Sequence, residues 1–174
     1  MTTATLPPAA LAASPSRTPT VRRRADAEFQ IRRADERDAL ALAALSRPFV
    51  HAGALRERPL SLYAARACDF LVAQAPDGTL EGGLGLSEHA ADGVLYNFCV
   101  AAHRQGSGMG SRLLQAAFAR ARSRALTTLF TATTGSGRLF LGHGFVPSHP
   151  DLAPAAWART LDPARNARVL ARAL

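Results

Sequence analysis

The sequence predicts an α/β domain, because strand-like and helix-like segments alternate along most of its length. Residues 94–100 form an apolar run that ends in a turn dense in glycine. The turn continues into a helical pattern that extends to about Arg124, and a second apolar run follows at residues 129–133. We expect this strand, turn and helix to form the centre of the domain.

Length and composition indicate one globular domain. The chain has 174 residues, of which 48% are hydrophobic and 20% are charged, as in ordinary folded domains. No uninterrupted apolar stretch reaches the roughly 20 residues of a membrane helix, so we expect no membrane association. The net charge of +8 suggests nucleic acid as a binding partner, but the basic residues are all arginines and are scattered along the chain. We expect a solvated basic surface in which some arginines bind an anionic small molecule, and no nucleic acid.

The two cysteines, Cys68 and Cys99, are too few for a disulfide framework, and no residue spacing matches a metal site. We expect both to be buried thiols, and no metal. Cys99 lies within an apolar run, which favours a core thiol over a nucleophile.

The first 27 residues differ in composition from the rest. They are rich in Ala, Pro, Thr and Ser, carry three successive arginines at 22–24 and show no apolar periodicity. We interpret residues 1–27 as a disordered tail and residues 28–174 as the folded domain. A targeting peptide is less favoured, because the tail has no secretory apolar segment after its charges and no clear amphipathic helix.

The first part of the domain alternates short elements. Residues 29–33 alternate as a strand, and Asp35 is a credible N-cap for a helix over 36–45. Residues 49–59 are loop-like, and a short helix follows at 60–67.

The middle of the domain predicts three strands joined by turns. These strands are expected at 69–74, at 80–88 and at 94–100, with turns by composition at 76–79 and 90–93. Glycines within the second of them indicate a bulge or a close approach of backbone; they are Gly82, Gly83 and Gly85.

The glycine-rich turn predicts an anion site. Gly106, Gly108 and Gly110 let the backbone approach a ligand closely, and the first N–H groups of the following helix favour a phosphate. The chain contains no lysine, which excludes a P-loop, and the glycine spacing does not match the dinucleotide-binding fingerprint. A turn without any ligand is the alternative at this point.

The segment from Gln105 to Gly110 resembles the Q/R-x-x-G-x-G/A signature of the GNAT superfamily of N-acetyltransferases. The segment 137–147, Gly-Arg-Leu-Phe-Leu-Gly-His-Gly-Phe-Val-Pro, is similar to the last helix and strand entry of that family. The resemblance extends from about Phe29 to the C-terminus. It implies a GNAT fold, a mixed but mostly antiparallel sheet whose fourth and fifth strands are parallel and splay apart, flanked by helices.

The same resemblance implies acetyl-CoA as cosubstrate, with the pyrophosphate on the loop N–H groups and the pantetheine arm between the splayed strands. Arg104 or Arg112 is expected to meet a phosphate. The residues expected to bind the cofactor are Phe98, Cys99, Val100, Arg104, Gln105, Gly106, Ser107, Gly108, Met109, Gly110, Ser111 and Phe140.

Within the superfamily, the C-terminal third resembles the acetyltransferase domain of bacterial N-acetylglutamate synthases. This implies L-glutamate as acceptor, in arginine biosynthesis, with Arg165 near its α-carboxylate and Arg56 or Arg58 as a second cation. Two departures stand out, since Val94 replaces a glutamate that acts through water and Ala167 replaces a serine.

The resemblance also implies direct attack of a neutral amine on the thioester, with backbone N–H groups near Val100 polarising its carbonyl. The tyrosine that often protonates the leaving thiolate is replaced by Phe140, which leaves Tyr96 and Thr134, together with Thr133, as catalytic candidates. No general base is named.

Two other functions stay open. One is a GNAT enzyme for another small amine, including a detoxification substrate, and the other is a non-enzymatic basic module that binds nucleic acid. We expect a cytoplasmic protein, and a homodimer is possible because similar proteins commonly dimerise.

Overall fold

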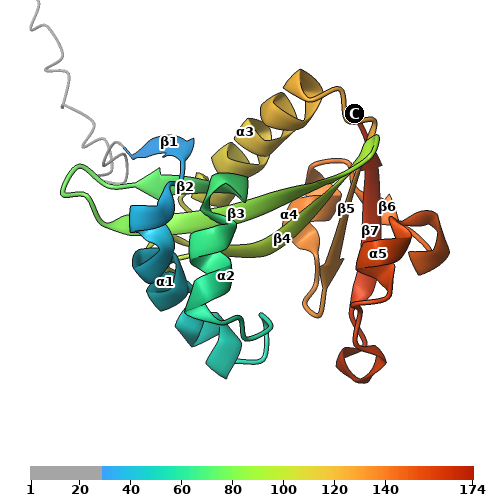
Figure 1. The fold of residues 1–174 in the computed structure, drawn as a ribbon, viewed down its shortest axis with the longest axis horizontal. Helices are drawn as coiled ribbons and strands as arrows, with labels where there is room; N and C mark the ends of the chain where they lie inside the picture. The colour runs from blue at the N-terminus through green and yellow to red at the C-terminus, as the bar shows by residue number, and fades with distance from the viewer. Residues whose placement is uncertain (1–28) are drawn as a thin grey trace, which may run out of the picture.

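The computed structural model describes residues 29–174, and the predicted tail at 1–27 lies outside them. Within this range the chain forms one mixed β-sheet flanked by helices (Figure 1). The strands are β1 Gln30–Arg33, β2 Phe70–Gln74, β3 Leu80–His89, β4 Asp92–Val100, β5 Thr128–Thr133, β6 Val146–Pro147 and β7 Arg168–Ala173. The α-helices are α1 Ala39–His51, α2 Leu60–Ala65, α3 Met109–Ser123, α4 Arg138–Gly142 and α5 Ala155–Ala158. Short 3-10 turns are η1 Glu36–Asp38, η2 Ala67–Asp69, η3 Ala102–Arg104, η4 Pro150–Leu152 and η5 Pro163–Arg165.

The sheet has the order β1-β2-β3-β4-β5-β7-β6, and its one parallel pair is β4 with β5. That parallel ladder is short: it starts at Asp92 and Thr128 and ends at Val94 and Phe130. Beyond it the two strands run apart, as Figure 1 shows, and the Thr131 hydroxyl donates to the carbonyl of Leu95 at 3.1 Å. The predicted splayed pair is therefore confirmed. Beyond Val94, β4 has no ladder partner in β5, which leaves a gap between the two strands.

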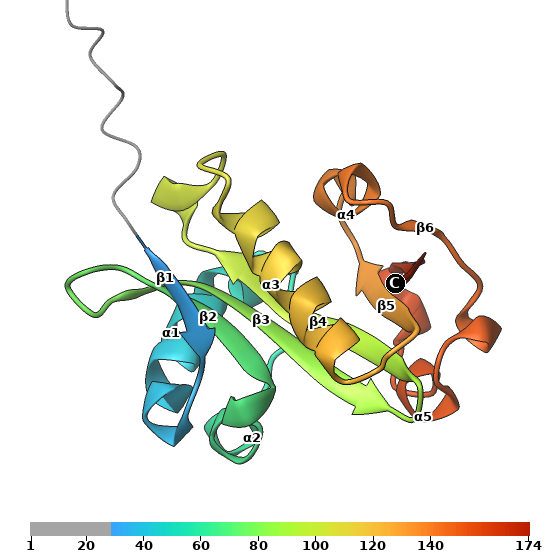
Figure 2. The ribbon, with the colours of Figure 1, turned by 90° about the horizontal axis from the view of Figure 1, so that it is seen from above.

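Helices cover both faces of the sheet, as Figure 2 shows from above. Helices α1 and α2 pack on one face, around Leu42, Tyr63 and Phe70. Helix α3 packs on the other through a continuous apolar stripe; the buried side chains of that stripe are Met109, Leu113, Leu114, Ala117, Phe118 and Ala121. Its period of three to four residues explains why this stretch is a helix with one buried face.

A β-bulge interrupts β4. Tyr96 pairs with Gly85 and Cys99 pairs with Gly83, so two residues of β4 stand opposite one residue of β3. Asn97 takes up the extra length with a φ of +50°, a left-handed conformation that asparagine tolerates better than most residues. Tyr96 and Asn97 consequently both reach the face covered by α1, where strict alternation would place them on opposite faces.

The glycines of β3 allow close packing, as their spacing predicts. A Cβ at Gly85 would lie 2.6 Å from the Tyr96 ring, and one at Gly82 would lie 2.8 Å from the side chain of Leu113. Of the two predicted alternatives these distances confirm the close approach, since the register shift between Gly83 and Gly85 has its extra residue in β4.

The first helix differs from the prediction. Asp35 does cap a helical turn, since its side chain accepts from the Arg37 N–H, but that turn is the 3-10 segment η1. Helix α1 then continues to His51, through Pro48, where a loop was expected from residue 49. Pro48 removes one N–H donor from this helix, and Ser46, two residues earlier, is buried against β4. The predicted strand at 69–74 begins at Phe70, because Asp69 ends a 3-10 turn.

No helix within residues 29–174 is both long enough and apolar enough to cross a membrane.

We predict that Gly85→Ala lowers the free energy of unfolding by about 1–3 kcal/mol, because the new methyl group overlaps the half-buried Tyr96 ring. Gly142→Ala is the matched control. Its Cβ would meet nothing within 4 Å at the end of α4, so its stability should stay the same or rise by up to about 1 kcal/mol. Urea unfolding followed by circular dichroism measures both. Equal stability of the two variants would contradict the packing argument.

Candidate active site

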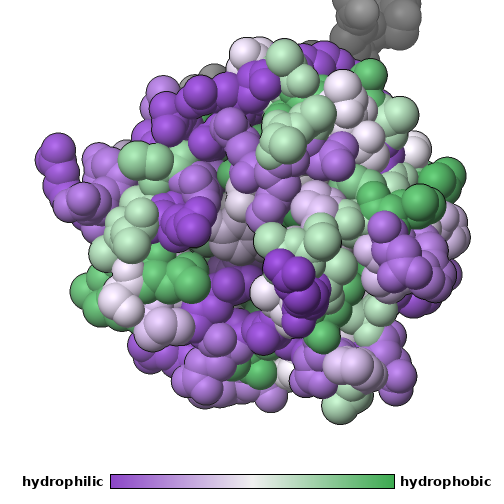
Figure 3. Space-filling view, turned by 45° about the vertical axis from the view of Figure 1, so that its right-hand side comes forward, coloured by the Kyte–Doolittle hydropathy of each residue, from purple (hydrophilic) through white to green (hydrophobic). Residues whose placement is uncertain are grey.

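Two cavities meet at the bulge of β4. The first, of about 490 Å³, is lined on β4 by residues 94–97 and will be called the arginine cavity. The second, of about 550 Å³, is lined on β4 by residues 98–100 and by the glycine-rich turn, and will be called the loop cavity. The face shown in Figure 3 is mostly hydrophilic and is hollowed near its middle. The bulge between Asn97 and Phe98 is thus the boundary between two binding spaces.

The loop cavity has the features of an anion site. Gly106 and Gly108 adopt φ values of +78° and +86°, and a Cβ built on either would meet nothing within 4 Å, so both face open space. Gly108 is also the N-cap of α3 and has no side chain to accept from the first N–H groups of that helix. These donors are therefore available to a phosphate.

The two arginines near this loop flank the ring of Phe29. The guanidinium of Arg112 lies 4.2 Å and that of Arg104 lies 5.6 Å from the ring centroid. Arg104 lines the loop cavity and is held by an ion pair with Glu81 at 2.9 Å. The Nε2 of His103 lies 3.0 Å from the other oxygen of Glu81.

Nine of the twelve residues predicted to bind the cofactor line the loop cavity, so most of the predicted set lies together in the structure. They are Phe98, Cys99, Val100, Arg104, Gln105, Gly106, Gly108, Gly110 and Ser111. The other three lie beside it. Met109 is fully buried in the core, so that only its backbone faces the loop. The Ser107 hydroxyl donates to the carbonyl of Arg104, and Phe140 packs edge-on against Phe98 at 5.7 Å.

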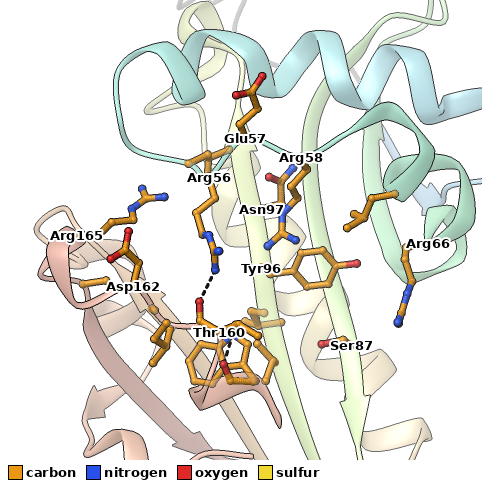
Figure 4. A pocket seen from close by; sticks show the side chains of 18 of the residues that line it. Arg56, Glu57, Arg58, Arg66, Ser87, Tyr96, Asn97, Thr160, Asp162 and Arg165 are labelled. Atoms are coloured by element: carbon orange, nitrogen blue, oxygen red, sulfur yellow. Dashed lines mark hydrogen bonds between the residues drawn. The ribbon is translucent and has the colours of Figure 1, made fainter.

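The arginine cavity lies between the α1–α2 loop, β4 and the C-terminal segment (Figure 4). Arg56 of the loop donates to the carbonyl of Thr160, and Arg165 donates to the carbonyl of Gly53 at 2.7 Å. Two segments more than 100 positions apart are thereby joined over the cavity. A guanidinium has five N–H donors, so each arginine keeps donors for a ligand.

Arg58 is the most buried of the predicted substrate residues. Its guanidinium lies 5.1 Å from the centroid of the Tyr96 ring, and its Nε is buried without a hydrogen-bond partner among residues 29–174. This burial lowers the pKa of Arg58 from its ordinary value. A carboxylate in the cavity would relieve this desolvation.

Both predicted catalytic hydroxyls line the arginine cavity. The Tyr96 hydroxyl donates to Asp69 at 3.2 Å, and Arg66 lies 3.5 Å from the same carboxylate oxygen. Burial, and then the negative charge of Asp69, raise the pKa of Tyr96 well above its ordinary value. Tyr96 is therefore a neutral donor committed to Asp69. Thr134 lies at the exposed rim beyond the end of β5.

Several lining residues were not predicted, among them Asn97, Asp69 and Trp157. Asn97 carries a signal in the sequence, since it is the one strongly polar side chain within the apolar run 94–100. Trp157 lies in α5, a helix of four residues that is too short for any periodicity to reveal.

The two cysteines differ, and the expectation for Cys68 is wrong. Cys68 is exposed because it lies in the short 3-10 turn η2 that connects α2 to β2. Cys99 is buried as expected, and its burial raises the pKa of the thiol to about 11. A neutral thiol in the core does not act as a nucleophile at neutral pH. Within residues 29–174 no group of three His, Cys, Asp or Glu side chains is arranged to hold a metal ion.

We predict that a thiol reagent such as dithiobisnitrobenzoate modifies Cys68 of the native protein quickly at pH 8, and Cys99 only after unfolding. Absorbance should report one thiol in buffer and two in guanidinium chloride.

The raised pKa of Cys99 also predicts a pH-dependent stability. Between about pH 9 and about pH 11 the unfolded state loses the thiol proton and the folded state keeps it, so the free energy of unfolding should fall as the pH rises through this range. The variant Cys99→Ala should lack that part of the pH dependence. Fast native modification of both thiols would contradict the burial of Cys99.

Comparison with known proteins agrees with this geometry. Residues 66–147 match the family model described as an acetyltransferase (GNAT) domain. An amino-acid acetyltransferase of Ralstonia nicotianae is 32% identical over 151 residues, which are 86% of this chain and 33% of that protein. One from Ectopseudomonas mendocina is 42% identical over 72 residues, 41% of this chain and 16% of that protein.

Among solved structures, this chain is similar to N-acetylglutamate synthase from Neisseria gonorrhoeae, complexed with coenzyme A and N-acetyl-glutamate. The two share 29% identity with a TM-score of 0.79, over 84% of this chain and 35% of the synthase. The chain spans about a third or less of the length of these relatives.

Proposed function

We propose that this chain, which carries an acetyltransferase domain of the GNAT superfamily, transfers the acetyl group of acetyl-CoA to the α-amino group of an acidic amino acid, with L-glutamate as the first candidate. The observation that carries the proposal is the junction of the two cavities at the β4 bulge. One cavity suits a phosphate-bearing cosubstrate, and the other presents arginines to an anionic acceptor. This activity would serve arginine biosynthesis.

The residues of the loop cavity fit acetyl-CoA. Open glycines and the free N–H groups at the start of α3 would hold its pyrophosphate. The gap between β4 and β5, which opens after Val94, offers backbone groups to the pantetheine arm as an added strand would. Gly110 has a different role: a Cβ there would lie 3.0 Å from Leu139 and 3.4 Å from Phe98, so glycine lets the first turn of α3 sit against the cavity wall.

The reaction needs little from the protein beyond positioning and proton management. The ammonium of the acceptor releases one proton to solvent, and the neutral nitrogen forms a bond to the thioester carbon. The carbon–sulfur bond then breaks, and a second proton from the nitrogen ends on the departing thiolate. We expect backbone N–H groups of β4 beyond the bulge to stabilise the oxyanion. The roles of Tyr96 and Thr134 stay predictions, and the hydroxyl of Tyr96 is already engaged with Asp69.

The arginines support an acidic acceptor. Arg56, Arg58 and Arg165 come from two segments that face each other across the cavity (Figure 4). A dicarboxylate amino acid requires two cationic contacts that are separated in space, and guanidinium groups bind carboxylates with charge-assisted, often bidentate hydrogen bonds.

A second acceptor class has specific support. Val94 is fully buried at the position expected to carry a glutamate, and Ala167 lines the cavity in place of a serine. The cavity also contains three acidic residues, Glu57, Asp69 and Asp162. These features favour a GNAT enzyme for another small amine, and a panel of acceptors separates the two proposals.

We predict that Gly108→Ala weakens coenzyme A binding by at least 10-fold, because a methyl group then occupies the space facing the loop and the left-handed backbone is strained. Gly78→Ala is the control, with a nearly equal φ of +89° in the β2–β3 turn, away from both cavities. Calorimetry should find that Gly78→Ala binds coenzyme A with the wild-type affinity, although both variants lose a similar amount of folding stability. Equal coenzyme A affinities of the two variants would contradict the assignment of this loop to the cofactor site.

We predict release of free thiol from acetyl-CoA with L-glutamate, measured beside other amino acids, small amines and no acceptor. Arg165→Ala should raise the KM for glutamate about 10- to 100-fold, since it removes a charge-assisted contact to a carboxylate. Arg159→Ala, an exposed arginine of the same segment outside the cavity, should leave the KM unchanged. A better acceptor than glutamate would select the second proposal.

A further inference from the structure

The side chain of Asn97 has a place in this site that the proposed function does not use. It is 6% exposed and lies on the wall of the arginine cavity, directly before the boundary with the loop cavity. Its Oδ1 is buried and accepts no hydrogen bond from any donor within residues 29–174. A buried carbonyl oxygen without a donor is uncommon and calls for a functional explanation.

The orientation of the Asn97 amide follows from its neighbours. The hydroxyl of Ser46 donates to the carbonyl of Leu42 at 2.8 Å, one turn earlier in α1. Because that hydrogen is already used, the Ser46 oxygen accepts, and the atom 2.8 Å from it must be the Asn97 Nδ2 donor. Oδ1 is therefore turned away from α1.

Arg58 supplies the complementary observation. Its Nε is the other buried, unpartnered side-chain atom on the wall of this cavity within residues 29–174. Figure 4 shows Asn97 next to Arg58, on the side of β4 that faces the α1–α2 loop. One wall thus presents an unpaired cationic donor and an unpaired neutral acceptor. An α-amino acid carries the matching pair, a carboxylate beside an ammonium.

Resting on the proposed function, we propose that Asn97 binds the amino group of the acceptor, with its Oδ1 accepting a hydrogen bond from the nitrogen that is acetylated. Arg58 pairs with the adjacent carboxylate. The bulge sets this residue at the boundary of the cavities, where the nitrogen must lie to reach the thioester. Specificity for α-amino acids then comes from Asn97 and Arg58 together.

The test compares L-glutamate with glutarate, which has both carboxylates but no amine. Trp157, the one tryptophan of the chain, lines the cavity, so its fluorescence in saturating coenzyme A reports binding of either ligand without turnover. Asn97→Gly removes the amide and keeps the left-handed backbone free of strain. Ser46→Ala is the matched control, because it removes the same Asn97–Ser46 hydrogen bond but keeps the Asn97 amide, whose Oδ1 a bound ammonium can still orient.

We expect Asn97→Gly to weaken glutamate binding about 10- to 100-fold, as for a hydrogen bond to a charged group, and to change glutarate binding less than 3-fold. Ser46→Ala should change both less than 3-fold, and Asn97→Asp, which keeps an oxygen acceptor, should retain the preference for glutamate. The proposal is overturned if Asn97→Gly weakens the binding of both ligands equally, or if Ser46→Ala weakens glutamate binding as much as Asn97→Gly does. If the wild-type protein binds neither ligand, the acidic acceptor is wrong. The same comparison with the best amine of the panel and its des-amino analogue then decides the role of Asn97 separately.

Discussion

The geometry of this domain depends on the early end of one parallel ladder. Strands β4 and β5 pair over three residues and then separate, and β4 bulges at Asn97, three residues beyond the last pair. A sheet that stayed paired would satisfy its backbone internally and leave nothing for a ligand. Because the two strands part, backbone donors and acceptors in the middle of the molecule remain available. The helices on both faces hold the separated strands in place.

Charge is used differently in the two cavities. The loop cavity relies on backbone N–H groups and open glycines, and its nearest arginine, Arg104, is held by Glu81. The arginine cavity relies on long side chains, and two of them are fixed by bonds to carbonyl oxygens of the opposite wall. A phosphate can be held by rigid backbone because its shape is constant, whereas discrimination between amino acids requires side chains that are positioned individually.

Those parts of the site that depend on local chemistry could be predicted from the sequence. The glycines at 106 and 108 have positive φ values, and the strand, turn and helix around them follow from apolar periodicity. Arg165 and the two alternatives for a second cation, Arg56 and Arg58, all line one cavity, and their roles toward a substrate stay predictions. Contacts between distant segments could not be predicted. Pro48 normally signals the end of a helix, yet α1 continues to His51, and Ser46 of the same helix meets Asn97 some 50 positions later. The placement of Trp157 depends on how the C-terminal segment folds back.

The bonds from Arg56 to Thr160 and from Arg165 to Gly53 also concern the order in which the domain is completed during synthesis. The lining of the loop cavity comes from residues 49–139, whereas the arginine cavity needs residues 156–167 as well. As the chain leaves the ribosome, the elements of the loop cavity emerge first. The wall of the arginine cavity is completed only when β7 is inserted between β5 and β6. A ligand that needs both walls of the arginine cavity would therefore stabilise the finished domain rather than its intermediates.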